Sequence, residues 1–181
     1  VEAMVAAILA LRMMSSYNMS VGEALWHGVF HSVSAFNNAG FSTNADSVMG
    51  YQSDPIILVP IMLAVILTAL GFPVMQDLRD KRFAWKRWSL HSKVTVYGTA
   101  ALLALGFAAI LAMEWSNAGT LGPMSVGGKV LNAAFHSVMP RTAGFNSVDV
   151  GAFHDQTLMV NYLLMFIGGG SAGTAGGIKV T

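Results

Sequence analysis

Two short segments of this sequence end in the same tripeptide, Ala-Gly-Phe, and their backbone carbonyl groups could bind a cation. The segments read Asn-Asn-Ala-Gly-Phe at residues 37–41 and Arg-Thr-Ala-Gly-Phe at residues 141–145. Glycine reaches backbone conformations in which successive carbonyl groups face one axis, and rings of carbonyl groups can replace the hydration shell of a cation. We therefore expect an ion-binding filter formed by Asn38, Ala39, Gly40, Phe41, Thr142, Ala143, Gly144 and Phe145. The expected ligands are the backbone carbonyl groups of Asn38, Ala39, Thr142 and Ala143, with each phenylalanine packed behind its loop.

The same tetrapeptide, Phe-His-Ser-Val, precedes each of these segments. It stands at residues 30–33 and 135–138, which are 105 positions apart, while the two Ala-Gly-Phe tripeptides are 104 positions apart. A phrase repeated at a nearly constant distance indicates two copies of one structural unit. One copy alone could be a turn that joins two helices. Both copies precede a long apolar run, which favours re-entrant pore loops, because irregular backbone at membrane depth must be buried in protein or line a water-filled path.

His31 and His136 occupy equivalent positions in the repeat, and each is followed by a serine. A serine–histidine pair could serve an intramembrane hydrolase. Adjacent residues on one helix point in different directions, so this pair is a poor nucleophile and base, and we expect both histidines to pack within the pore-helix bundle. We therefore expect no catalytic residue and no enzyme. The chain has no cysteine, which excludes disulfides and thiolate metal sites.

Apolar residues dominate the composition. The chain of 181 residues is 54% hydrophobic and 10% charged, whereas a soluble domain usually carries about 25% charged residues. Residues 55–75 contain no charge and, as one helix, would extend through about 30 Å of bilayer. Residues 93–115 form a second apolar run and residues 157–178 a third, while residues 1–11 are interpreted as the tail of a helix in a fragment of a longer chain. These runs predict an all-α integral membrane protein.

The basic residues are concentrated between the two longest apolar runs. Six of the ten lie there: Arg79, Lys81, Arg82, Lys86, Arg87 and Lys93. By the positive-inside rule, residues 77–92 are cytoplasmic. A patch for anionic lipid or nucleic acid is the alternative for such a cluster.

Two short helices are expected before the Ala-Gly-Phe segments, at residues 22–36 and 125–139. Ser20 and Glu23 predict a capping box at the start of the first, and Ser125 is the candidate cap of the second. With residues 77–92 inside the cell, both helices begin outside. Both are too short to cross the membrane, so they dip in and return, with the negative ends of their dipoles toward the membrane centre.

A glycine-rich segment interrupts the third apolar run. Residues 168–177 contain six glycines, each of which destabilises a helix by about 1 kcal/mol relative to alanine. A helix that begins near Asp155 should therefore break here, and broken helices in membranes bind or gate ions. The segment lacks the contiguous Gly-Lys-Ser/Thr of a phosphate-binding loop. A flexible cytoplasmic linker is the alternative.

Five motifs occur in order along the chain: residues 30–42, Leu-Gly-Phe-Pro-Val at 70–74, His-Ser-Lys at 91–93, Arg-Thr-Ala-Gly-Phe at 141–145, and residues 168–181. Together they resemble the Trk/Ktr/HKT superfamily of potassium transporters, and more narrowly the bacterial membrane subunits of Trk and Ktr. The resemblance implies four repeats around a central pore, each with a membrane helix, a pore helix, a filter loop and a second membrane helix. Residues 1–78 would be the second repeat with a truncated first helix, residues 79–92 a cytoplasmic basic loop, and residues 93–181 the third repeat.

The resemblance also implies an activity and partners. It implies K+ uptake, with no cofactor bound to this chain. It also implies a homodimer in the bacterial inner membrane, in which each chain crosses the membrane several times. The implied partner is a cytosolic regulatory ring that binds nucleotides, and no nucleic acid is bound. An intramembrane gate loop below the filter would be formed by Gly168, Gly169, Gly170, Ser171, Ala172, Gly173, Thr174, Ala175, Gly176 and Gly177, followed by the basic Lys179. A Na+-permeable or Na+/K+ transporter is the alternative within this architecture. An intramembrane enzyme and a non-conducting scaffold are alternatives outside it.

Two positions depart from the pattern of the superfamily. Pro140 stands where a small polar residue is expected, and Thr68-Ala69 replaces a glycine pair before Leu70-Gly71. We expect both changes to alter local packing without removing the filter.

Overall fold

The computed structural model describes residues 1–82, 84–141 and 143–179. Regular structure in these residues is helical, apart from one isolated bridge between Ile167 and Ile178, which agrees with the all-α prediction. The α-helices are α1 (Glu2–Tyr17), α2 (Val21–Phe36), α3 (Pro55–Ala69), α4 (Phe72–Lys81), α5 (Leu90–Glu114), α6 (Val126–Val138) and α7 (Asp155–Phe166). Short 3-10 turns are η1 (Met49–Tyr51), η2 (Trp85–Arg87), η3 (Met139–Arg141) and η4 (Val150–Ala152).

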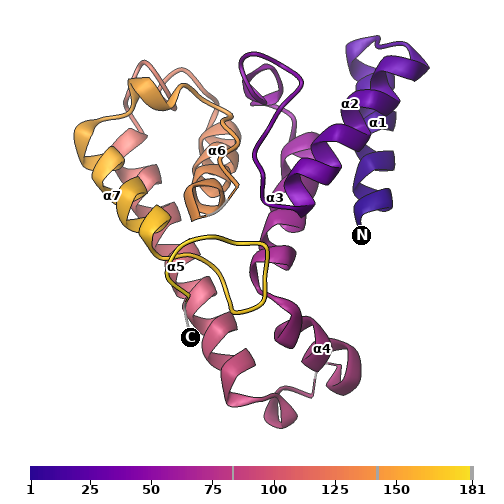
Figure 1. Ribbon diagram of the computed structural model, residues 1–181. Helices are drawn as coiled ribbons and strands as arrows, with labels where there is room; N and C mark the ends of the chain where they lie inside the picture. The colour runs from indigo at the N-terminus through magenta and orange to yellow at the C-terminus, as the bar shows by residue number, and fades with distance from the viewer. Residues whose placement is uncertain (83, 142, 180–181) are drawn as a thin grey trace.

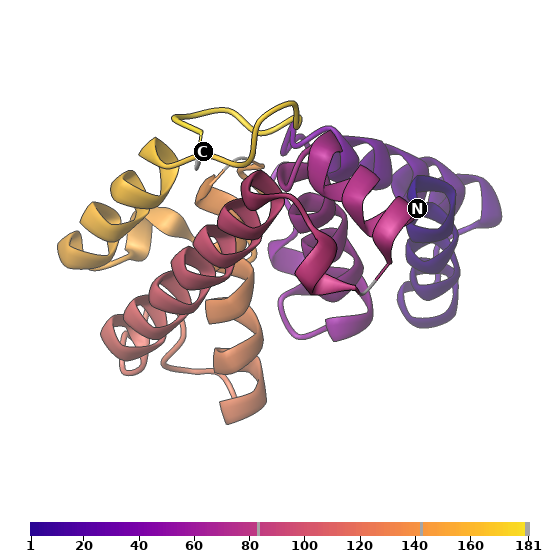
Figure 2. The same cartoon turned by 90° about the horizontal axis from the view of Figure 1, so that it is seen from below.

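The helices form two units of the same order (Figure 1). In the first unit α1, α2 and α3 pack on one another, and in the second α6 and α7 both pack on α5. The units meet where α3 contacts α6, and α4 leads from one unit to the other while contacting α5. Seen from below, the two units lie side by side (Figure 2). The sequence repeat is therefore a repeat of a three-helix unit.

Serine caps begin the middle helix of each unit. The Ser20 side chain accepts a hydrogen bond from Glu23 N, and the Glu23 carboxylate accepts one from Ser20 N at 3.1 Å, so the predicted capping box is present. The hydrogen bonds from Ser20 hold the pKa of the Glu23 carboxyl below its usual value. In the second unit, Ser125 Oγ accepts from Gly128 N at 3.2 Å. Both middle helices start within a residue of the predicted position because their first turns are capped by local hydroxyl groups.

A buried carboxylate ties the first and third helices of each unit together. In the first unit it is Asp54, the N-cap of α3, which accepts from Ile56 N at 2.9 Å. The same carboxylate accepts from Arg12 Nε on α1 at 2.7 Å and from Tyr17 Oη at 3.2 Å. The end of α1 and the start of α3 are thus joined through one side chain.

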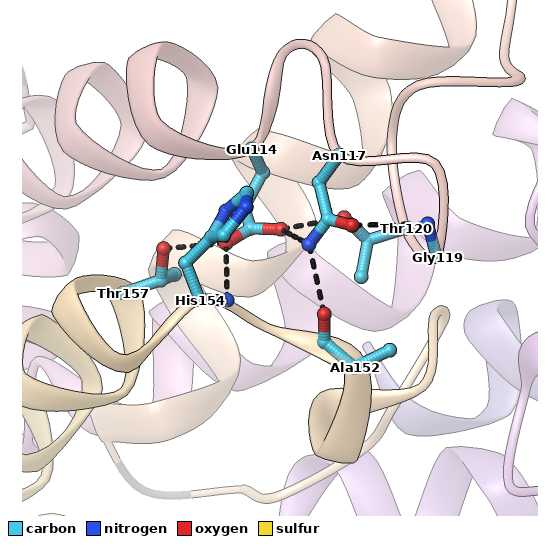
Figure 3. A network of polar contacts seen from close by, with 7 residues as sticks. All are labelled: Glu114, Asn117, Gly119, Thr120, Ala152, His154 and Thr157. Atoms are coloured by element: carbon cyan, nitrogen blue, oxygen red, sulfur yellow. Dashed lines mark hydrogen bonds and ion pairs between the residues drawn. The ribbon is translucent and has the colours of Figure 1, made fainter.

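In the second unit the carboxylate is Glu114, the last residue of α5, and it is fully buried (Figure 3). Its Oε1 accepts from His154 N, the N-cap of α7, at 3.0 Å and from Thr157 Oγ1 at 2.5 Å. Its Oε2 accepts from Thr120 Oγ1 and Asn117 Nδ2, both at 2.6 Å. The same pair of helix ends is joined as in the first unit, but here the acid is on the first helix rather than the third.

The expected straight helix over residues 55–75 is wrong. The chain bends by 95° between α3 and α4, and Gly71 at the bend has φ 85°, a conformation that glycine adopts without strain. Pro73 lies in the first turn of α4, where proline is tolerated, and it disfavours a helical residue before it. A further reason for the bend is tertiary, because residues 168–177 occupy its inner side, as described below.

α5 crosses the length of the second unit without interruption. Among the described residues it is the one helix long and apolar enough to span a membrane unaided, and the bent pair α3–α4 brings the number of candidate spans to two. It begins at Leu90, three residues before the expected start, because Ser89 Oγ caps it by accepting from Ser92 N at 3.1 Å. α4 likewise continues to Lys81, so the basic segment is partly helical at both ends.

Candidate cation-conduction site

The two Ala-Gly-Phe loops follow α2 and α6 and meet each other between the two units. Gly40 and Gly144 adopt the same left-handed conformation, with φ 71° and 82°. A β-carbon placed on Gly40 would lie 1.6 Å from the carbonyl oxygen of Ala143 and 3.2 Å from the carbonyl carbon of Gly144. The structure thus brings the two glycines together, and glycine is required at position 40 because a neighbouring carbonyl group occupies the space of a side chain.

The two phenylalanines of the repeat are placed differently. Phe145 is fully buried and lies against His31 of the first unit, with 6.3 Å between ring centroids. Phe41 is 70% exposed in this chain. The ring of Phe145 is thus packed against the first unit, whereas most of Phe41 is exposed. That each aromatic ring packs behind its own loop stays a prediction.

The repeated histidines anchor the segments that leave the loops. His31 Nδ1 faces the carbonyl oxygen of His27 at 2.7 Å, and its Nε2 lies 2.9 Å from Ser42 Oγ. His136 Nε2 accepts from Ser147 N at 3.4 Å. Both histidines are buried, as expected for packed side chains. His27 lies one turn before His31, yet among the described residues no group of three or more His, Asp or Glu side chains could hold a metal ion.

The glycine-rich segment leaves the end of α7 and packs into the bend between α3 and α4 (Figures 1 and 2). Gly170 N donates to Ala69 O at 2.8 Å, and Phe72 N donates to Ala172 O at 3.2 Å. A β-carbon on Gly170 would lie 2.3 Å from Leu70 O. This backbone-to-backbone packing requires glycine, which gives a physical reason for the composition of residues 168–177.

Two polar side chains connect this loop to the segments that follow α2 and α6. Asn38 Nδ2 donates to Thr174 Oγ1 at 2.5 Å and to Thr68 Oγ1 at 3.1 Å. Arg141 Nη2 donates to Gly168 O at 2.8 Å. At the end of the loop Lys179 Nζ donates to Ala175 O at 2.5 Å, so this lysine stabilises the loop itself.

The structure describes all of the expected site residues except one. Thr142 lies outside the described residues. Thr68 and Arg141 contact the loops but were not expected to do so. Arg141 is 5% exposed. Arginine is almost never fully buried without a partner, so a basic residue directly after an expected short helix is a signal that could have identified it.

Comparison with known proteins places this arrangement in a family. Residues 1–181 match the TrkH family, described as cation transport protein. The chain belongs to this family. TrkH-family relatives include Ktr system potassium uptake protein B of Bacillus subtilis, 43% identical over all of this chain and 40% of the relative. The protein of the same name from Vibrio alginolyticus is 38% identical over 87% of this chain and 35% of the relative.

Two further matches extend the comparison. Potassium/sodium uptake protein NtpJ of Enterococcus hirae is 38% identical over 88% of this chain and 35% of the relative. The crystal structure of the potassium transporter TrkH from Vibrio parahaemolyticus superimposes with a TM-score of 0.75 at 22% identity, covering 99% of this chain and 36% of that one. The chain therefore spans 35–40% of the length of these TrkH-family proteins, and the TrkH fold is shared across nearly all of it.

Proposed function

We propose that this chain forms part of the conduction path of a membrane subunit that takes up K+. The observation that carries the proposal is the contact between Gly40 and the carbonyl group of Ala143, which joins the two Ala-Gly-Phe tripeptides of the repeat. Left-handed glycines that bring carbonyl groups of neighbouring units together suit the dehydration of a monovalent cation. The names of the relatives that match this chain support K+ as the ion.

We infer that the filter contains more than these two loops, from the surroundings of Gly144 and Phe41. A β-carbon on Gly144 would meet nothing within 4 Å among the described residues, and Phe41 is exposed where Phe145 is covered by His31. Further units of the same kind, one on each side, would face Gly144 with a carbonyl group and cover Phe41 with a histidine. The greater length of the relatives leaves room for such units.

The loop of residues 168–177 is the proposed gate. It lies between the units, contacts Asn38 next to one Ala-Gly-Phe tripeptide, and packs in the bend of α3–α4. Deleting residues 171–175 from the full-length protein should raise K+ flux while leaving both Ala-Gly-Phe loops intact. A deleted protein that folds, inserts and conducts as the wild type does would identify the segment as a linker.

The subunit would be a multi-pass protein of the bacterial inner membrane. It would form a homodimer that docks on a cytosolic nucleotide-binding ring. Family membership supports a membrane location. No bond is made or broken, and the driving force would be about 2.3 kcal/mol per charge for each 100 mV of membrane potential. The basic segment before α5 is the proposed cytoplasmic side.

Na+ permeation is the second candidate, and the name of the Enterococcus hirae relative favours it. Reconstitution of the full-length protein into liposomes, with separate K+ and Na+ gradients, distinguishes the two. K+ uptake that exceeds Na+ uptake, and that Gly40→Ser lowers, supports the proposed function. Equal passage of both ions assigns the alternative, and no passage of either ion overturns the filter assignment.

A further inference from the structure

The two side chains that hold the glycine-rich loop come from the segments just before the two Ala-Gly-Phe tripeptides, one residue apart in the register of the repeat. Asn38 immediately precedes the first Ala-Gly-Phe tripeptide, and Arg141 lies one residue farther upstream of the second. Asn38 binds Thr174 in the later half of the loop, and Arg141 binds the carbonyl group of Gly168 at its start. The loop is therefore held at both ends by the segments that carry the filter glycines.

The hydrogen bond from Arg141 to Gly168 O is buried within the protein. The guanidinium is buried and forms no ion pair with a carboxylate among the described residues. Hydrogen bonds from a charged donor are stronger than those between neutral groups. A buried guanidinium also has few alternative acceptors within reach. Gly168 O is thus a strongly preferred acceptor, and the start of the loop is held at η3.

The contact of Asn38 is linked to filter geometry. Asn38 itself has a left-handed backbone, with φ 52°, so the conformation that orients its carbonyl group also directs its side chain. Nδ2 is shared between Thr174 on the loop and Thr68 on α3. A change in the backbone at residues 38–40 would therefore move the donor away from Thr174.

Between the two contacts, backbone hydrogen bonds hold the loop in the bend of α3–α4. Gly170 N binds Ala69 O, and Ala172 O accepts from Phe72 N. These backbone contacts hold the middle of the loop in the bend, and the two polar contacts hold the loop to the segments that carry the filter glycines.

We propose that Asn38 and Arg141 are positioning residues that latch the glycine-rich loop to the two filter loops, so that ion occupancy of the filter sets the position of the loop. This proposal rests on the proposed function, because it requires a filter and a gate. Its ligand is the permeant cation itself: K+ bound by the carbonyl groups would order residues 38–40 and keep the Asn38–Thr174 contact closed.

The test uses the full-length protein in a background without other cysteines, with Gly176→Cys as a reporter on the loop. A β-carbon at position 176 meets no described residue within 4 Å, so the reporter itself should not disturb the loop. Two substitutions open the latch. Thr174→Val removes the acceptor of the Asn38 hydrogen bond without substituting a filter residue, and Arg141→Gln removes the charged donor. Thr99→Val is the matched control, since Thr99 Oγ1 is buried on α5 and has no hydrogen-bond partner among the described residues.

K+ should slow thiol modification of the reporter at position 176 relative to choline, both in the reference protein and in Thr99→Val. In Thr174→Val this K+ protection should fall by about fivefold, the factor for one net hydrogen bond. Arg141→Gln should lose protection likewise, and Arg141→Lys, which keeps a charged donor, should recover part of it. The K+/Na+ permeability ratio should stay unchanged in Thr174→Val, which separates loss of the latch from damage to the filter.

Two results are decisive against the latch. If Thr174→Val keeps full K+ protection, as Thr99→Val does, the contact does not position the loop, whatever happens to Arg141→Gln. Deletion of residues 171–175 separates this failure from failure of the proposed function. Raised flux in the deletion with normal protection in Thr174→Val refutes the latch alone, whereas unaltered flux in the deletion refutes the gate on which the latch depends.

Discussion

The carbonyl oxygen of Ala143 occupies the space that a side chain on Gly40 would need, 1.6 Å from the position of its β-carbon. The two residues belong to different units and are joined by no shared helix, so the contact is made by packing of the units at α3 and α6. It fixes the two Ala-Gly-Phe loops relative to each other and makes position 40 a sensitive test of the filter.

Serine at position 40 should abolish most K+ uptake by the full-length protein. The side chain would collide with Ala143 O, and a left-handed backbone adds about 1–3 kcal/mol of strain for a non-glycine residue. Gly144→Ser should be equally severe if another unit faces Gly144, as proposed. Uptake of Rb+ by cells measures both. Gly22→Ser is the control, because a β-carbon at Gly22 meets nothing within 4 Å in the part of the chain that the structure describes. A markedly milder Gly144→Ser would show that no further loop faces it.

Alanine at position 170 should displace the glycine-rich loop from the bend. Its β-carbon would lie 2.3 Å from Leu70 O and 2.7 Å from the Thr95 methyl group. Flux without the regulatory partner should rise several-fold, while Gly176→Ala, placed in open space, should behave as the wild type. Patch or liposome flux measurements compare the two. Equal flux in both variants would argue that packing in the bend does not hold the path closed.

A cysteine at Ala84 should be protected from a membrane-impermeant thiol reagent added outside intact cells. Ala84 is exposed and lies in the basic segment, which the positive-inside rule places in the cytoplasm. A cysteine at Ser16, exposed at the opposite end of the first unit, is the control that should react. Labelling at position 84 with protection at position 16 would invert the topology.

Removing the Glu114 carboxylate should destabilise the second unit more than any filter variant does. Glu114→Ala leaves Thr157, Thr120 and the backbone N–H of His154 without their acceptor. Several unsatisfied buried donors correspond to a loss of about 3 kcal/mol or more, and Glu114→Gln, which keeps one oxygen, should lose less. Thermal unfolding of the detergent-solubilised full-length protein measures this. The control is Asp46→Ala at an exposed carboxylate, which should stay within about 0.5 kcal/mol of the wild type.

Local patterns predicted several boundaries of the elements of this fold. Ser20 with Glu23 predicts the start of α2, Ser125 predicts the start of α6, and six glycines predict the break after Phe166. Each of these depends on residues within a turn or two of the chain, where hydroxyl caps and glycine act directly on the backbone. The repeat of Phe-His-Ser-Val likewise predicts two equivalent units.

Contacts between distant residues were decided by the tertiary structure. The bend at Gly71 depends on residues 168–177 filling its inner side, and the Asn38–Thr174 contact joins residues 136 positions apart. The contacts of the two histidines could not be predicted from the sequence either. His31 contacts Ser42 and His136 contacts Ser147, so these two contacts are 105 positions apart, although the Ala-Gly-Phe tripeptides are 104 positions apart. In both units the buried histidine contacts a serine 11 residues farther along the chain. Which positions meet in this way depends on the close packing of side chains from separate segments, which a local pattern does not specify.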